Sequence, residues 1–179
     1  MNINFRNITL WLLLLLLLVL SIRGCQERDP WLAAGVARKV LTAQDLGSEW
    51  RVGTIEQYNY DLVGPYLNEV GFAIRDFHGL GSRLEQSILV YRTDLGATVG
   101  LWRLQQRNHN LGFTVPYPQQ KRLNLPLFSS VDCDARGSDT CVIVIPKGNY
   151  LMEIVFHQTA MNANEIDHVV QLALAKLMR

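Results

Sequence analysis

The sequence has no strong excess of charge of either sign. Its 179 residues include 17 lysines and arginines against 16 aspartates and glutamates, and charged residues make up only 18% of the chain. Without Arg6 and Arg23, which lie in the N-terminal segment discussed below, 15 basic residues stand against 16 acidic ones. A balance so close to neutral gives no support to a general nucleic-acid-binding role, so nucleic acid is not an expected partner.

The motifs that mark common catalytic and metal sites are also missing. The sequence contains no GxSxG, no HExxH and no CxxC, and its four histidines are scattered. The glycines of Gly79-x-Gly81 lead into a predicted strand rather than a helix, so they indicate a hairpin turn and not a phosphate-binding loop. We therefore predict no catalytic residues, no metal site and no cofactor. A hydrolase whose site is assembled only by folding remains one alternative.

Long hydrophobic runs are absent except at the N-terminus. Residues 8–22 carry no charge, include seven consecutive leucines at 12–18 and follow a single cation, Arg6. A positive segment followed by 7–15 apolar residues is the layout of a signal peptide. As a helix, the run would span about 22 Å, which is short for a bilayer core of about 30 Å. Export is therefore predicted, and a membrane-spanning anchor is the weaker interpretation.

The apolar run ends in Ile22-Arg23-Gly24-Cys25, which resembles a bacterial lipobox. Ile22, Gly24 and Cys25 fit that pattern, whereas Arg23 occupies a position that is normally small and uncharged. We expect Cys25 to be lipidated, with acyl chains of the palmitate type, and diacylation would give stable membrane attachment. An uncleaved anchor and plain secretion are the alternatives. The expected division is a leader at 1–25, a tether at 26–30 and a single extracytoplasmic domain at 31–179.

The two remaining cysteines form an even pair. Cys133 and Cys141 are eight positions apart and flank a segment rich in turn-forming residues. Such a turn can bring two strand ends within the Cα distance of about 7 Å that a disulfide requires. A disulfide between them agrees with export from the cytoplasm.

Apolar residues alternate with a period of 2 or recur with a helical period along the rest of the chain. The C-terminal segment has the clearest stripe, made of Ile166, Val169, Val170, Ala173 and Leu177, and we expect it to pack on the face of the preceding strand. The expected helices are 31–43, 94–107 (capped by Asp94) and a last one to about 178 (capped by Asn162 or Asn164). The expected strands are 50–60, 70–77, 84–91, 127–133, 140–145 and 149–157, with a long loop at 108–126.

A hairpin followed by a helix occurs twice, at 70–107 and at 140–178. This order predicts an α+β fold, an antiparallel sheet with flanking helices that forms an α/β/α sandwich. The uninterrupted apolar run at 142–145 predicts a central strand buried on both faces.

The order of elements resembles that of a family of small bacterial cell-envelope lipoproteins. The resemblance is carried by the Asp45-Leu46-Gly47-x-x-Trp50 exit of the first helix and by Lys147-Gly148-Asn149 before the last strand and helix. It covers roughly residues 31–178. These lipoproteins resemble the PsbP-like α/β/α sandwich, which also occurs in extracellular sensor domains of some bacterial kinases. The resemblance implies a non-catalytic, extracytoplasmic role in binding or assembly.

One region has the composition of a ligand-binding groove. Basic and aromatic side chains alternate around the expected 108–126 loop, a length that is often functional. They could bind an anionic ligand or one that stacks on aromatic rings. They could equally form a solvated basic helix face with core aromatics. The candidate residues are Trp102, Arg103, Arg107, His109, Phe113, Tyr117, Lys121 and Arg122.

These observations favour a binding or interaction domain without catalytic activity. We expect it to be tethered to the extracytoplasmic face of the cell membrane by a lipid, and a single N-terminal anchor is the alternative. Its ligand is not identified by the sequence. The main competing hypothesis is a structural accessory subunit with a protein partner in the cell envelope. A deep pocket at the 108–126 loop would favour the first, and a flat exposed apolar patch would favour the second.

Overall fold

The computed structural model describes residues 32–59, 69–79, 81–157 and 161–179. The expected leader (1–25) and tether (26–30), including Cys25, lie outside the described residues. Among those described, no helix combines the length and apolar character needed to cross a membrane.

Seven strands form one antiparallel sheet in the order β1-β2-β3-β7-β6-β5-β4. Two sequential strand arrays, β1 to β3 and β4 to β7, therefore meet where β3 pairs with β7, with Gln86 opposite Ile154. The expected α+β class, an antiparallel sheet with flanking helices, is confirmed. The strands are β1 (Trp50–Asn59), β2 (Glu69–Gly79), β3 (Ser82–Tyr91), β4 (Phe113–Pro116), β5 (Ser130–Asp134), β6 (Thr140–Lys147) and β7 (Tyr150–His157).

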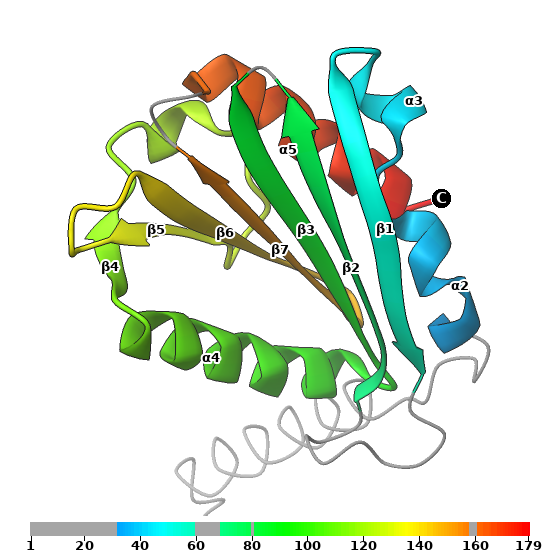
Figure 1. Cartoon of the computed structure of the whole chain (residues 1–179). Coiled ribbons are helices and arrows are strands. Elements are labelled where there is room, and N and C mark those ends of the chain that lie inside the picture. Colours follow the sequence, from blue (N-terminus) through cyan, green and yellow to red (C-terminus); the bar gives the residue numbers. More distant parts are fainter. Residues whose placement is uncertain (1–31, 60–68, 80, 158–160) are drawn as a thin grey trace, which may run out of the picture.

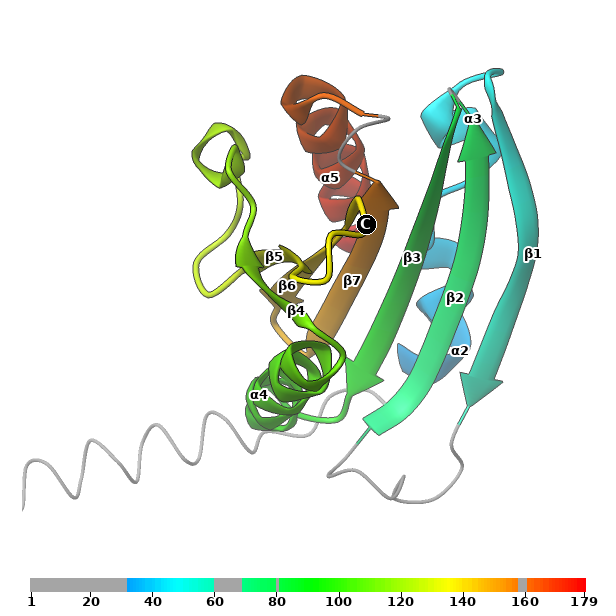
Figure 2. The same cartoon turned by 60° about the vertical axis from the view of Figure 1, so that its left-hand side comes forward.

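The helices cover both faces of this sheet, which makes the fold a three-layer sandwich (Figures 1 and 2). α4 packs on one face, chiefly against β6, β7, β4 and β3, while α2 packs on the other face against β1 to β3 and also touches α5. The two hairpin-helix units thus send their helices to opposite faces. The helices are α2 (Leu32–Lys39), α3 (Ala43–Leu46), α4 (Asp94–Asn110) and α5 (Ala163–Leu177), with a 3₁₀ turn, η1 (Gln120–Arg122).

β6 lies inside the sheet and is buried on both sides, as its apolar run predicts. Cys141, Ile143 and Ile145 belong to the core beneath α2 and α5, whereas Val142 and Val144 belong to the smaller core beneath α4. This division follows from the alternation of side chains along a strand. Each fully buried aliphatic side chain contributes about 1.5–3 kcal/mol.

The expected stripe of α5 is confirmed, because all five of its residues are buried. They share one core with Met152, Ile154 and Phe156 of β7, and Tyr150 packs at its edge. Asn162 is the N-cap: its side-chain oxygen accepts hydrogen bonds from the backbone N–H groups of Asn164 and Glu165.

The first helix ends at Lys39, four residues before the expected position. Val40 and Leu41 are buried in the core, and the Leu41 N–H donates to the buried Gln86 side chain at 2.8 Å instead of to a helical carbonyl. A separate short helix, α3, then begins after Thr42, whose backbone N–H and hydroxyl both donate to Asp45. The spacing of the apolar residues correctly predicts that Val40 and Leu41 are buried. It does not predict the end of the helix, because that depends on Gln86 of the distant strand β3.

The expected boundaries around α4 also need correction. Thr93, and not Asp94, caps the helix, with its hydroxyl accepting from the Gly96 N–H at 2.9 Å. The helix runs to Asn110, three residues beyond the expected end. The following segment is not one long loop, because it contains β4 and η1, and β5 begins at Ser130 rather than at residue 127.

Candidate functional site

A surface hollow of about 320 Å³ opens between the C-terminal half of α4 and strands β4 and β5. The helix supplies one wall, the start of β4 a second, and alternate residues of β5 the third. Small-molecule sites range over about 300–1,000 Å³, so this hollow lies at the lower end of that range. Its lining residues are Trp102, Gln105, Gln106, His109, Phe113, Thr114, Ser130 and Asp132.

Trp102 lines this hollow and is 60% exposed. By contrast, Trp50 is buried in the core beneath α2. Phe113, at the start of β4, packs against the edge of the core beneath α4 and adds a second aromatic ring. The exposed indole therefore faces solvent at the site and adds little to the core.

Asp132 places a carboxyl group on the β5 wall of the hollow. Burial raises the pKa of this carboxyl, while the Ser130 hydroxyl and the neighbouring His109 act to lower it. No lysine or arginine is among the described residues that line the hollow. An anionic ligand would thus meet a carboxyl group and no permanently positive side chain.

The expected groove is divided between separate surroundings. Trp102, His109 and Phe113 line the α4 hollow, whereas Tyr117 and Lys121 line another hollow, of about 710 Å³, in the loop after β4. Tyr117 is buried and its ring meets that of Phe156 edge-on, with centroids 5.6 Å apart. Tyr117 therefore belongs to the core, as one of the two interpretations of the sequence held.

The basic members of the expected groove also separate. Arg107 donates to both carboxylate oxygens of Glu153 on β7, at 2.9 and 2.7 Å, and so ties α4 to the sheet. Arg103 and Arg122 are exposed and line neither hollow. The arginines and the aromatic residues do not form one continuous basic groove.

Glu153 was not among the residues singled out from the sequence, and Asp132 was considered only with Asp134 and Asp139, as oxygen ligands for a cation beside the disulfide hairpin. Glu153 is the single acidic residue of the apolar strand β7. Its side chain is buried, and Arg107 supplies the positive charge that pairs with it. An isolated charge in an otherwise apolar strand is a signal for a buried ion pair, because an unpaired buried charge is costly. Asp132 carried no comparable signal, since acidic residues are common beside turns.

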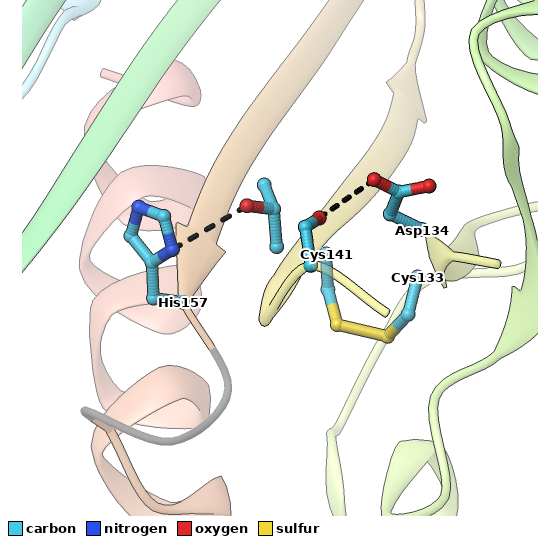
Figure 3. The surroundings of a disulfide bond; sticks show 6 residues. Cys133, Asp134, Cys141 and His157 are labelled. Atoms are coloured by element: carbon cyan, nitrogen blue, oxygen red, sulfur yellow. Dashed lines mark hydrogen bonds between the residues drawn. A yellow bond between two sulfur atoms is a disulfide. The ribbon is translucent and has the colours of Figure 1, made fainter. Parts of the chain in front are cut away.

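Cys133 and Cys141 are directly opposite in the β5–β6 register and form the expected disulfide, with Cα atoms 4.0 Å apart (Figure 3). Both cysteines are buried in the core beneath α5. Within the intervening hairpin, Asp134 accepts hydrogen bonds from the Arg136 Nε at 2.9 Å and from the Ser138 hydroxyl at 2.7 Å. These bonds lower the pKa of the Asp134 carboxyl. The disulfide and Asp134 act together to hold this turn.

The part of the chain that the structure describes contains no group of three or more histidine, cysteine, aspartate or glutamate side chains that could hold a metal ion. Asp132, Asp134 and Asp139 surround the disulfide hairpin without forming such a group.

The fold and the hollow define a mixed α+β domain with a small surface site beside an exposed tryptophan. The extracellular domain of PknH from Mycobacterium tuberculosis has a similar structure, with a TM-score of 0.55 over 87% of this chain and 97% of that chain. The two sequences are 9% identical, so the similarity is one of fold. It supports the expected resemblance at the level of fold, to an extracellular domain. No known protein-family model matches the sequence, and no curated protein matches it.

Proposed function

We propose that this protein is an extracytoplasmic binding domain without catalytic activity, tethered to the membrane at its N-terminus. The observation that carries the proposal is the hollow beside Trp102, where a large aromatic side chain is exposed among hydrogen-bonding groups. Exposed aromatic residues beside a concave site are typical of ligand recognition. The absence of any catalytic motif in the sequence favours binding over chemistry.

Membrane attachment is supported by the sequence before the domain. The cation at Arg6, the apolar run at 8–22 and the lipobox-like end at Cys25 together favour export and lipidation. The similarity in fold to an extracellular domain agrees with an extracytoplasmic location.

Attachment through Cys25 is tested by fractionating cells that express the full chain or Cys25→Ser. We expect the wild-type protein to carry the added mass of its lipid in the membrane fraction, and the variant to lack that mass and leave the membrane after processing. The double variant Cys133→Ser, Cys141→Ser is the control, because it removes the other two cysteines and should keep the lipid. An unchanged mass in Cys25→Ser would contradict lipidation, and unchanged membrane association would point to an uncleaved anchor.

Binding is tested by purifying the tagged, membrane-attached protein and identifying the small molecules and proteins that accompany it. The matched comparison is Trp102→Ala, which should keep the fold because the indole is largely exposed. A small molecule that accompanies the wild type and is lost from Trp102→Ala supports the proposal. Recovery of the same molecules from both proteins contradicts a role for the hollow.

A second candidate function, that of an accessory subunit in an envelope complex, is favoured by one other surface. Leu127 and Phe128 are 83% and 80% exposed at the turn before β5, and Phe128 has a φ of 66°. A bulky residue in this region of backbone space is strained, and such strain often marks a binding site. A protein partner that is lost from Leu127→Ser combined with Phe128→Asn, but kept by Trp102→Ala, would favour this function.

A further inference from the structure

From the chemistry of the Trp102 hollow we infer that its ligand is a neutral saccharide, with one sugar ring stacked on the indole of Trp102. This inference rests on the proposed function and names the class of ligand that the hollow would bind. Three properties of the site lead to it: the exposed aromatic face, the kind of polar groups around it and their charge.

The exposed indole favours a ligand that has an apolar face. The electron-rich face of an aromatic ring attracts partial positive charge. A pyranose ring presents several polarised C–H bonds on one face, so it packs flat against an indole. Trp102 leaves most of its surface free for such contact, and Phe113 adds a second aromatic ring to the same hollow.

The polar lining favours a ligand with many hydroxyl groups. Gln105 and Gln106 each offer an amide that both donates and accepts hydrogen bonds, and Thr114 adds a hydroxyl. The Asp132 carboxyl is an acceptor for two hydroxyl donors on adjacent ring carbons, and His109 contributes a ring nitrogen. A purely apolar ligand would leave these groups unpaired, which costs about 1–3 kcal/mol for each buried group.

The charge of the lining disfavours an anionic ligand. Asp132 is the acidic residue of the hollow, and no described lysine or arginine lines it, so a phosphate or carboxylate would meet this carboxyl group with no permanently positive side chain to offset it. A quaternary ammonium ion is the best competitor, because aromatic rings beside a carboxylate suit cations. The two amides and the hydroxyls have no partner on such an ion, and they favour the saccharide.

The test uses the full chain in detergent and a panel of neutral tetrasaccharides: cellotetraose, maltotetraose, tetra-N-acetylchitotetraose, mannotetraose and galactotetraose. Saturation-transfer NMR detects binding, and titration calorimetry measures Kd for any sugar that binds. We expect at least one sugar to bind and Trp102→Ala to raise its Kd by about tenfold or more. Trp102→Phe should retain part of the affinity, and Asp132→Asn should weaken it.

Arg103→Ala is the matched control, because it changes the next residue of α4 without changing the lining of the hollow; it should leave Kd unchanged. Circular dichroism checks that every variant keeps the fold. The inference is overturned if none of the five sugars binds, or if binding survives Trp102→Ala with the same Kd.

Tetramethylammonium and inorganic phosphate are titrated in parallel, so that failure of the saccharide inference can be distinguished from failure of the proposed binding function. Trp102-dependent binding of either ion, without binding of a sugar, overturns the saccharide inference and leaves the proposed binding function standing. If no probe binds and affinity purification returns no Trp102-dependent molecule, the proposed binding function fails as well.

Discussion

Arg107 on α4 holds the carboxylate of Glu153 on β7 through two hydrogen bonds, at 2.9 and 2.7 Å. The Glu153 side chain is nearly buried, while the Arg107 guanidinium is half-exposed at the edge of the helix. The buried Asn108 side chain adds a third contact to the same carboxylate at 3.3 Å. The pair fixes the position of α4, and with it the helical wall of the Trp102 hollow.

We expect Arg107→Ala to lower the free energy of unfolding by about 1–3 kcal/mol, because it leaves a nearly buried carboxylate without its main partner. Combining Arg107→Ala with Glu153→Gln should cost less than the sum of the two single changes, since the charge that needs a partner is gone. Urea unfolding of the four proteins measures this coupling. Strict additivity would mean that the ion pair does not hold α4 to the sheet.

Gly100 allows α4 to approach Tyr91. A Cβ at position 100 would lie 2.3 Å from the hydroxyl oxygen of the buried Tyr91 ring. Gly100→Ala should therefore destabilise the protein by about 1–3 kcal/mol, despite the higher helix propensity of alanine. Gly35→Ala in α2 is the matched control, because a Cβ there has no atom within 4 Å. It should instead stabilise by about 0.5–1 kcal/mol. A melting temperature of Gly100→Ala that is not lower than that of the wild type would contradict the close approach.

Glu69 should make the stability dependent on pH. Burial raises the pKa of its carboxyl above the unfolded value, so the folded protein keeps this proton at pH values where the unfolded chain has released it. The stability should thus fall as pH rises from below the unfolded pKa, near 4.3, through the folded pKa, and then level off.

Glu69→Gln removes this titration, so its melting temperature should exceed that of the wild type at pH 8, with the difference shrinking toward pH 4. Calorimetry at both pH values measures it. Glu56→Gln on β1 is the control, since Glu56 is exposed. A lower melting temperature for Glu69→Gln at pH 8 would show that the carboxylate has a stabilising partner there.

The disulfide should be present in the exported protein. Mass spectrometry of non-reduced peptides should recover Cys133 and Cys141 in one linked species, and two alkylatable thiols would refute it. Replacing both by serine should cost about 2–3 kcal/mol by the chain-entropy argument for a short loop. The fold should persist, because the core beneath α2 and α5 extends well beyond the two sulfur atoms.

Val170→Asp should destabilise the protein by about 3 kcal/mol or more, because it places an unpaired charge at a fully buried position of α5. His168→Asp on the exposed side of the helix should stay within about 0.5 kcal/mol of the wild type. Gln171 is a poorer control, since its amide donates to the Asn124 carbonyl at 2.8 Å. Equal melting temperatures for the Val170→Asp and His168→Asp variants would mean that α5 is not docked by this stripe.

Local patterns in the sequence are enough to predict most of the element types and many of the buried residues. The period of α5, the alternation of β7 and the apolar run of β6 are such patterns, and the structure buries the residues that they predict. The pairing of Cys133 with Cys141 was equally predictable, because only eight positions separate them and a turn lies between.

The contacts of those residues depend on the tertiary structure. A local pattern marks a buried face but does not identify the surface that covers it, so the placement of α4 and α5 on opposite faces could not be read from their periods. Gln86 ends the first helix from 45 residues away, and Arg107 reaches Glu153 across 46. Such long-range contacts separate the residues of the expected basic groove. They also bring Asp132 of β5 to the same hollow as Trp102. Side chains that are distant in the sequence meet only when the sheet has ordered its strands.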